Sequence, residues 1–420
     1  MVSTQQVARH PEGRSVAEHR SVAEIYAAVE RSQDAVVLGR QEPARAPFGR
    51  GGEGIPKGRD PLAQRSEKGG VAALGKDYEI AFTPRKKYDK FELQSVAKKA
   101  LPGERVAICF RNRRCKNSEV EVWKHHSSEK AFYGNLVVCG SVWQCPVCAA
   151  KISELRKKEL RCAVDGHLKT GKLAMLTLTF SHQKSDRLKE TLAKFSKAVD
   201  RFRSGKRYAR VMKEMGLIGT IRSFEITYGA NGWHPHIHIL MFYTNEIELE
   251  EVEDELMDLW SLALSSTGLS ANRKYGLTLQ DAKKASDYVS KWGVEHEMTK
   301  SHSKTGKQGG MTPFDLLREF LATGDKSMLG LFQEYAEAVK KKRQLIWSKG
   351  LKAMFLLEEK TDEQLANEKT EEAELIGTIE DEVWKWIARA EKRGQFLRLV
   401  EQHGDIELAF DILLEDFSDG

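Results

Sequence analysis

Three histidines stand at every second position in one short apolar stretch, GWHPHIHIL, which runs from Gly232 to Leu240. In a β-strand, residues two apart share a face, so His234, His236 and His238 are expected to point the same way. Neutral imidazoles one pleat apart can chelate a divalent cation. The stretch therefore predicts a metal-binding strand. The alternatives are a plain polar strand face and hydrogen-bonded core histidines.

A carboxylate that would complete such a ligand set is expected on the preceding strand. Glu225 is the only acid in the otherwise apolar and basic segment IRSFEITY. Segments 218–227 and 235–242 are predicted to form a hairpin, because the intervening YGANGW carries an Asn-Gly turn signal. A hairpin would bring Glu225 across from the histidines, which favours the metal interpretation.

Cysteines gather upstream of these strands. Cys145 and Cys148 form a C-x-x-C turn, which places two thiolates on one metal, and a tetrahedral zinc site needs four ligands. Cys139 lies just before this turn in CGSVWQCPVC, and Cys109 and Cys115 lie further upstream. A redox role is disfavoured because no thioredoxin-like βαβ pattern surrounds the turn. His125 and His126 are weaker candidate ligands, and Cys162 is expected in the core.

The whole chain has the composition of a soluble globular protein. It has 420 residues, 40% hydrophobic and 30% charged, and a net charge of +6. This length allows two or three domains. No apolar run approaches the roughly 20 residues of a membrane span, and the N-terminal sequence lacks the apolar core of a secretion signal. A cytoplasmic location is expected, where the six cysteines would stay reduced.

The pattern of elements predicts an α+β fold, an antiparallel sheet with flanking helices, preceded by a small zinc-binding module. Helices are expected over 153–167, 186–215, 246–265 and 281–292, and a strand over 173–180. Thr312 and Pro313 are typical of a helix start. The predicted domains are a flexible basic arm (1–100), the zinc module (101–165), the main domain (166–355) and an acidic, helical or disordered tail (356–420).

HPHIHIL resembles the His-hydrophobic-His motif of HUH endonucleases, and specifically of rolling-circle replication initiators from plasmids. The resemblance implies that His236 and His238 bind a catalytic divalent cation, Mg²⁺ or Mn²⁺, with Glu225 as the third ligand. His234 would support them from outside the ligand set. LTLTF (176–180) resembles the family's first motif, a strand beside the metal. The main domain would then be an HUH nuclease domain with an RRM-like palm.

The cysteine pattern is similar to that of initiators carrying C…CGSVW-x-CPVC ahead of the nuclease. This similarity selects Cys115, Cys139, Cys145 and Cys148 as ligands of a structural Zn²⁺. Cys109 remains the main competitor for the place of Cys115.

The segment DYVSKW resembles the family's third motif, Tyr-x-x-Lys. Tyr288 and Lys291 would share one helix face. A phenol with a pKa near ~10 is a poor nucleophile until metal or positive charge favours phenolate. Tyr288 is therefore expected to attack DNA phosphorus, and Lys291 to orient the phosphate or stabilise charge. The alternative is an ordinary half-buried helix tyrosine.

The resemblance implies a site-specific single-strand DNA endonuclease that initiates rolling-circle replication. It would nick a single-stranded or cruciform site at a plasmid origin, forming a 5′-phosphotyrosine link and a 3′-OH primer. Without a G-x-x-x-x-G-K-[ST] motif, a host helicase is an expected partner, together with DNA polymerase. No membrane partner is expected, and homodimer formation stays open. The alternatives are a relaxase or transposase of the same superfamily, a water-using metal hydrolase, and a non-catalytic zinc-dependent DNA-binding regulator.

Basic residues cluster in RNRRCKN, KISELRKKELR and RFRSGKRYAR. Lysine and arginine at this density suit phosphate contacts, although a solvated helix face gives the same pattern. The candidate DNA-binding residues are Arg111, Arg113, Arg114, Lys157, Lys158 and Arg207.

Overall fold

The computed structural model describes residues 89–281, 310–368 and 372–418. Residues 82–414 belong to one compact unit. Most of the predicted basic arm and the segment with Tyr288 and Lys291 lie outside the described residues.

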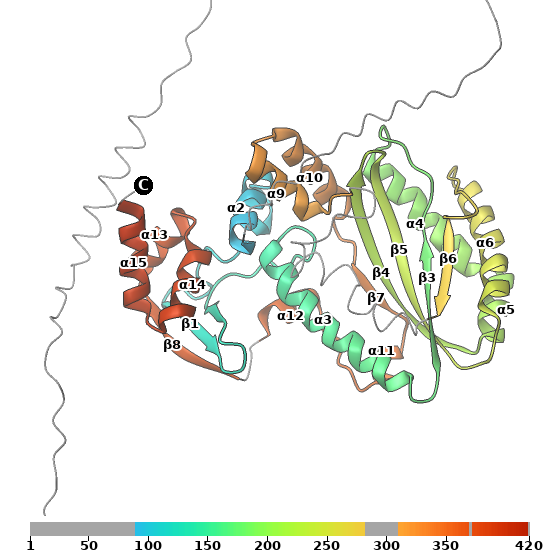
Figure 1. The fold of residues 1–420 in the computed structure, drawn as a ribbon, viewed down its shortest axis with the longest axis horizontal. Helices are drawn as coiled ribbons and strands as arrows, with labels where there is room; N and C mark the ends of the chain where they lie inside the picture. The colour runs from blue at the N-terminus through green and yellow to red at the C-terminus, as the bar shows by residue number, and fades with distance from the viewer. Residues whose placement is uncertain (1–88, 282–309, 369–371, 419–420) are drawn as a thin grey trace, which may run out of the picture. The chain divides into compact units, whose positions relative to one another are not determined.

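A five-stranded antiparallel sheet, in the order β6-β3-β5-β4-β7, carries the histidine strand (Figure 1). Its strands are β3 (Lys172–Leu178), β4 (Leu217–Gly229), β5 (Gly232–Tyr243), β6 (Leu277–Asp281) and β7 (Leu345–Trp347). The predicted antiparallel α+β class is thereby confirmed, and so is the hairpin, which is β4 and β5. Strand β6 was not predicted.

The β4–β5 hairpin turns within two residues, and glycine is required where it ends. Gly229 pairs with Gly232 across the turn. Gly232 has a φ of +83°, in the left-handed region that favours glycine. A Cβ at this position would also lie 2.9 Å from the Cα of Lys184. Glycine at this position thus permits the two-residue turn, and the length of the turn sets the register of the hairpin.

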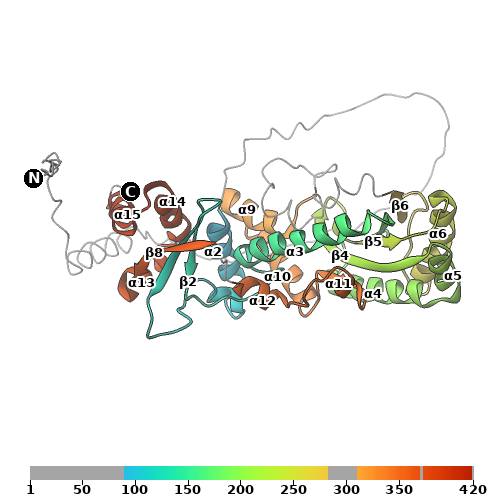
Figure 2. The same cartoon turned by 90° about the horizontal axis from the view of Figure 1, so that it is seen from below.

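A second antiparallel sheet, in the order β2-β1-β8, lies in the part of the chain that contains the cysteines (Figures 1 and 2). It consists of β1 (Val120–His125), β2 (Ala131–Gly134) and β8 (Ala373–Ile379). The accompanying helices are α2 (Lys90–Ala100), α13 (Asp381–Arg389), α14 (Arg393–His403) and α15 (Ile406–Ser418). The central strand thus pairs with one neighbour close in sequence and one more than two hundred residues away.

This sheet corrects the predicted domain limits at both ends of the chain. Residues 90–100, assigned to the flexible arm, form helix α2, and its Phe91, Leu93 and Val96 are buried. The segment assigned to a tail supplies strand β8 and the helices that follow it. A helical tail was one of the two predicted alternatives, whereas helix α2 and strand β8 were not predicted, because the contacts that order them are made by distant parts of the chain.

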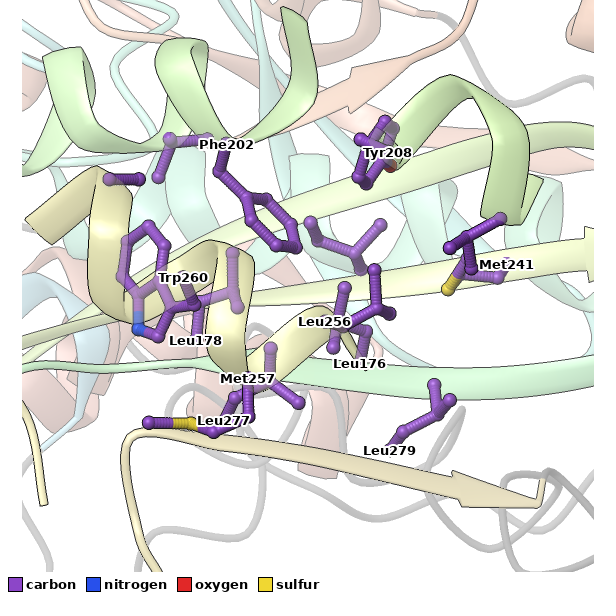
Figure 3. Close-up of a cluster of buried hydrophobic side chains, with 14 of the residues drawn as sticks. Leu176, Leu178, Phe202, Tyr208, Met241, Leu256, Met257, Trp260, Leu277 and Leu279 are labelled. Carbon is purple, nitrogen blue, oxygen red and sulfur yellow. The ribbon is translucent and has the colours of Figure 1, made fainter. Parts of the chain in front are cut away.

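The α-helices α4 (Leu188–Ser204), α5 (Lys206–Glu214) and α6 (Leu249–Ser265) cover one face of the main sheet. Leu176 and Met241 of the sheet belong to one buried apolar cluster with Phe202 and Trp260 of these helices (Figure 3). Trp260 is fully buried, and its indole N–H donates to the Thr179 carbonyl at 2.9 Å. This apolar face explains why the polar ligands all point to the other side.

The opposite face packs on α3 (Pro146–His167) and α11 (Leu351–Met354), where Leu240 and Phe242 meet Leu160 and Val164. The helix α3 begins at the C-x-x-C turn, with Cys145 as its N-cap and Pro146 in its first turn. One helix therefore runs from the cysteines to the main sheet, across the predicted boundary at residue 165.

The remaining helices are η1 (Arg105–Ala107), α9 (Pro313–Thr323), α10 (Lys326–Ala338) and α12 (Asp362–Asn367). The predicted start of α9 is confirmed, since Thr312 caps it reciprocally with Asp315 and Pro313 follows directly. Within the described ranges, we find no helix whose apolar stretch is long enough to cross a membrane.

A buried ionic cluster joins α2 and the segment after η1 to the C-terminal helices. The guanidinium of Arg393 is fully buried and donates to Glu391 at 3.0 Å and to Gln94 at 2.6 Å. Arg111 donates to the same Glu391 carboxylate at 2.7 Å. Burial would raise the pKa of Glu391, but hydrogen bonds from Arg111 and Ser95 hold it below its usual range. The carboxylate is the shared partner of two buried cations.

We predict that Glu391→Gln lowers the free energy of unfolding by about 2 kcal/mol, because two buried arginines lose their shared charge. The pKa of Glu391 is lower in the folded than in the unfolded protein. The carboxylate therefore stabilises the fold fully above its ordinary pKa of about 4.3, and this stabilisation is lost as the pH falls from there through the folded-state pKa. Urea unfolding at neutral pH and near pH ~4 measures both effects.

The matched control is Glu359→Gln, because Glu359 is exposed and forms no ion pair with any of the residues that the structure describes. Equal stability of the two variants at neutral pH would contradict the stabilising role of Glu391.

Candidate metal centres

The hairpin brings Glu225, His236 and His238 together. Glu225 and His236 are direct cross-strand partners. One carboxylate oxygen, Oε2 of Glu225, lies 3.0 Å from Nε2 of His236 and 3.5 Å from Nε2 of His238. One ligand atom from each of the three residues lies within 4.8 Å of the others. Two imidazoles and a carboxylate form a donor set that can hold a divalent cation.

The neighbouring strand β3 orients one of these imidazoles. Thr177 pairs with His238 across the strands, and its hydroxyl lies 3.0 Å from Nδ1 of His238. A proton on Nδ1 would be donated to this hydroxyl and would leave the Nε2 lone pair free to bind a cation. The segment LTLTF was predicted to lie beside the site, but Thr177 was not identified as a contact. The threonine alternation along that strand was the available signal.

His234 has different partners from the other two histidines. Its Nδ1 lies 2.8 Å from Nε2 of His182, and its Nε2 lies 3.5 Å from the hydroxyl of Thr179. His182 in turn contacts the carbonyl of Asn231 in the turn through its Nδ1, at 2.9 Å. His234 therefore lies beside the three-residue set, and His182 is a neighbour that was not predicted from the sequence.

The local electrostatics keep the Glu225 carboxylate anionic and the His234 imidazole neutral. Burial would raise the pKa of Glu225, but the His236 charge and hydrogen bonds from both imidazoles hold it well below its usual range. Burial would lower the pKa of His236, yet the Glu225 carboxylate raises it above its ordinary value. Burial and the neighbouring His236 and His182 lower the pKa of His234 to about 4. Negative charge is thus concentrated at Glu225.

Four cysteines form a second donor set. The Sγ of Cys148 lies 3.5 Å from those of Cys109 and Cys139, and the Sγ of Cys145 lies 3.8 Å from that of Cys109. All four are buried and lie within 4.8 Å of one another. The amide of Gln94 donates to Cys145 Sγ at 3.1 Å.

Cys109, and not the predicted Cys115, lies with the other three cysteines. Cys115 is exposed, and its Sγ accepts from the hydroxyl of Ser118 at 3.5 Å. Cys109 follows η1 and has no exposed surface. Sequence spacing could not choose between them. Cys162, expected in the core, is also exposed.

Contacts among the four thiols shift their pKa values in opposite directions. Contacts with the Cys109 thiol raise the pKa of Cys139 and Cys148. Burial would raise the pKa of Cys145, but hydrogen bonds from the other thiols hold it well below its ordinary value. Four buried thiols would lose their protons only to a cation, and tetrahedral zinc binds such sets. The donor chemistry and the distances of the four cysteines therefore fit a zinc ion.

The predicted DNA-binding residues fall into different environments. Arg111 is buried and donates to the Ala388 carbonyl and to Glu391, so it is structural and that prediction was wrong. Arg113 forms an ion pair with Asp381 at 2.9 Å. Arg207 lies 3.5 Å from Glu255 and is half exposed. The other three candidates are the exposed Arg114 and Lys158 and the half-buried Lys157.

Fold and donor sets together define an α+β protein with two candidate metal centres. The family described as "Replication protein" matches residues 135–394, which is more than half of the chain. The chain therefore belongs to this replication protein family.

Three curated relatives are similar to parts of the chain. A "Protein rep" of Streptomyces lividans is 26% identical over 53% of this chain and 64% of its own. A "Neomycin resistance protein" of Streptomyces cyanogenus is 30% identical over 27% of this chain and 32% of its own. A "Protein rep" of Lentilactobacillus hilgardii is 32% identical over 23% of this chain and 31% of its own. The chain thus spans less than two thirds of each relative, and no solved structure matches it.

We predict that two of the six thiols in the native protein react quickly with Ellman's reagent, because only Cys115 and Cys162 are exposed. The Cys115→Ser variant should lose one fast thiol, whereas Cys109→Ser should keep both. Stopped-flow absorbance measures the fast amplitude, and unfolding in denaturant gives the total. A Cys115→Ser protein that keeps both fast thiols would contradict the assignment.

Proposed function

We propose that this protein initiates rolling-circle replication by nicking one DNA strand at a plasmid origin. The observation that carries the proposal is the convergence of Glu225, His236 and His238 on one face of the hairpin. It occurs in a member of the replication protein family, in the strand that resembles the HUH motif. An HUH nuclease domain with an RRM-like palm is part of this proposal.

The donor set suits Mg²⁺ or Mn²⁺, because it includes the Glu225 carboxylate and because its side chains are held in a fixed orientation. Glu225 and the two imidazoles would hold the cation, and Thr177 would keep Nε2 of His238 unprotonated. When bound, the cation would polarise the scissile phosphate and offset the negative charge that develops on it. The protein's own contribution is to keep Glu225 anionic and the three side chains in register.

Tyr288 is proposed as the nucleophile. Its phenolic oxygen would form a bond to phosphorus as the bond to the 3′ oxygen breaks, giving a 5′-phosphotyrosine link and a free 3′-OH. Lys291 would stabilise the phosphate charge. These roles are supported by the Tyr-x-x-Lys resemblance. The DNA strand, a host helicase and a DNA polymerase are the proposed partners.

Zinc is proposed as a structural ion at Cys109, Cys139, Cys145 and Cys148. Four buried thiols with a hydrogen-bonded outer partner, Gln94, fit a closed structural site. The ion would link the start of α3, the loop before it and the segment after η1, which provide these cysteines.

We predict that purified protein with Mn²⁺ nicks supercoiled origin plasmid and becomes covalently attached to DNA through Tyr288. Tyr288→Phe should reduce nicking by at least about a thousandfold, because the nucleophile is lost. His238→Ala should lose the adduct through loss of the cation. Gel electrophoresis measures the nicking, and mass spectrometry of the digested adduct identifies the attached residue.

The matched control is Tyr275→Phe, since Tyr275 is an exposed tyrosine and should leave nicking unchanged. Nicking without an adduct would indicate water as the nucleophile. Binding without nicking under both metals would leave a DNA-binding zinc protein.

We predict that Cys109→Ser lowers the zinc content to well below one ion per chain, whereas Cys115→Ser keeps it near one. The buried thiolate supplies a ligand that the exposed one does not. Elemental analysis of the folded proteins gives the ratio. Zinc retained by Cys109→Ser but lost by Cys115→Ser would reverse the assignment.

A further inference from the structure

The face of the main sheet that packs on α4 contains a cavity of about 320 Å³. Its walls are helix α4, strands β4 and β5, and the segment 342–346 that leads into β7. Its lining includes the charged and apolar side chains of Asp200, Arg222, Phe224, Ile237, Lys342 and Arg343.

This cavity is separate from the histidine site, because the two lie on opposite faces of the sheet. Side chains alternate between the faces along a strand. Ile237 lies between His236 and His238 in β5, and it lines the cavity while they meet Glu225. Phe224 likewise precedes Glu225 in β4. A ligand in the cavity would therefore have no contact with the three metal donors.

The cavity has more positive than negative charge. Arg222, Lys342 and Arg343 line it, and Asp200 is the only acid among the described residues of the lining. In the described part of the chain, the Arg222 guanidinium has no hydrogen bond or ion pair. Burial and the nearby Arg203 lower the pKa of Arg222, and Asp200 only partly offsets them. A half-buried cation that forms no ion pair is costly, so a bound anion would stabilise this arrangement.

Arg203 is a second cation close to Arg222. Nε of Arg203 is buried and has no hydrogen-bond partner among the residues that the structure describes. Arg203 also contributes to the lowered pKa of Arg222, which places the two guanidinium groups within electrostatic reach. Arg203 therefore adds positive charge near Arg222, and its side chain also bonds to the hydroxyl of Tyr208.

The rest of the lining is apolar. Val199, Phe224, Ile237 and Ile346 provide a wall of one aromatic and three aliphatic side chains. Phe224 is held edge-on against Trp143, with ring centroids 6.2 Å apart. Apolar walls with a few convergent charges are typical of small-molecule sites, and this volume is at the lower end of their range. A planar base and a phosphate would match the two kinds of lining.

We propose that this cavity binds a nucleoside phosphate, with the phosphate at Arg222 and Arg343 and the base against Phe224 and Ile237. The ligand is either a free nucleotide or one nucleotide of a DNA strand, since both present the same chemistry. The site goes beyond the proposed nicking reaction and does not depend on it.

The test is calorimetric titration of the full chain with dTMP, thymidine and a short oligothymidylate. Buffers contain no phosphate, Mg²⁺ or Mn²⁺, so that the histidine site does not contribute. We expect dTMP to bind and thymidine to bind far more weakly. Arg222→Gln and Arg343→Gln should each weaken dTMP binding by about tenfold, because each removes a charge-assisted contact.

Two further variants make the test specific to this cavity. Asp200→Asn should strengthen binding, because it removes the one acid of the lining. Lys349→Gln is the matched control, since Lys349 is exposed, lies close in sequence and does not line the cavity. Circular dichroism and thermal unfolding establish that each variant is folded, and Arg343, which is exposed, allows the test if Arg222→Gln does not fold.

The two sources are distinguished by the oligonucleotide. If the same variants weaken oligothymidylate binding while dTMP does not bind, the ligand is a nucleotide of a strand. If the variants weaken the binding of dTMP but leave the binding of oligothymidylate unchanged, the ligand is a free nucleotide. The proposal is overturned if the Arg222 and Arg343 variants bind dTMP and the oligonucleotide as the wild type does.

Discussion

The register of the β4–β5 hairpin is the constraint on which the candidate active site depends. A shift by one residue would turn His236 and His238 into the apolar core and expose Ile237 and Ile239. The short turn at Gly232 prevents that shift, since its φ of +83° and the nearby Lys184 backbone admit only glycine. The geometry of the metal donors is therefore set by a backbone turn several residues away.

The same alternation gives the sheet two chemically different faces. One face presents Glu225 and the histidines, and the other presents Arg222 and Phe224 to α4. The strands separate an anionic, cation-attracting centre from a cationic, anion-attracting cavity, which keeps the two charges from neutralising each other.

Local signals predicted the local structure. The Asn-Gly turn indicated the hairpin, Thr312 and Pro313 indicated the start of α9, and the HPHIH spacing indicated the shared face. Long-range contacts were not predictable from one sequence. The β1–β8 pairing and the burial of Arg111 depend on residues more than 200 positions away, and only the folded chain shows that Cys109, not Cys115, faces the other thiols.

The C-terminal segment and the cysteine cluster are connected by one chain of buried hydrogen bonds. Arg393 donates to the side-chain carbonyl of Gln94, and the amide of Gln94 donates to Cys145. Any change in the charge of the Cys145 sulfur alters the strength of the bond from Gln94, because hydrogen bonds to charged acceptors are stronger. The residues that were predicted from sequence to be an arm and a tail thus lie in the polar shell around the four thiols. Loss of the C-terminal helices would remove Arg393 and leave Gln94 without the partner that orients its amide, so the surroundings of the four thiols depend on the C-terminal segment.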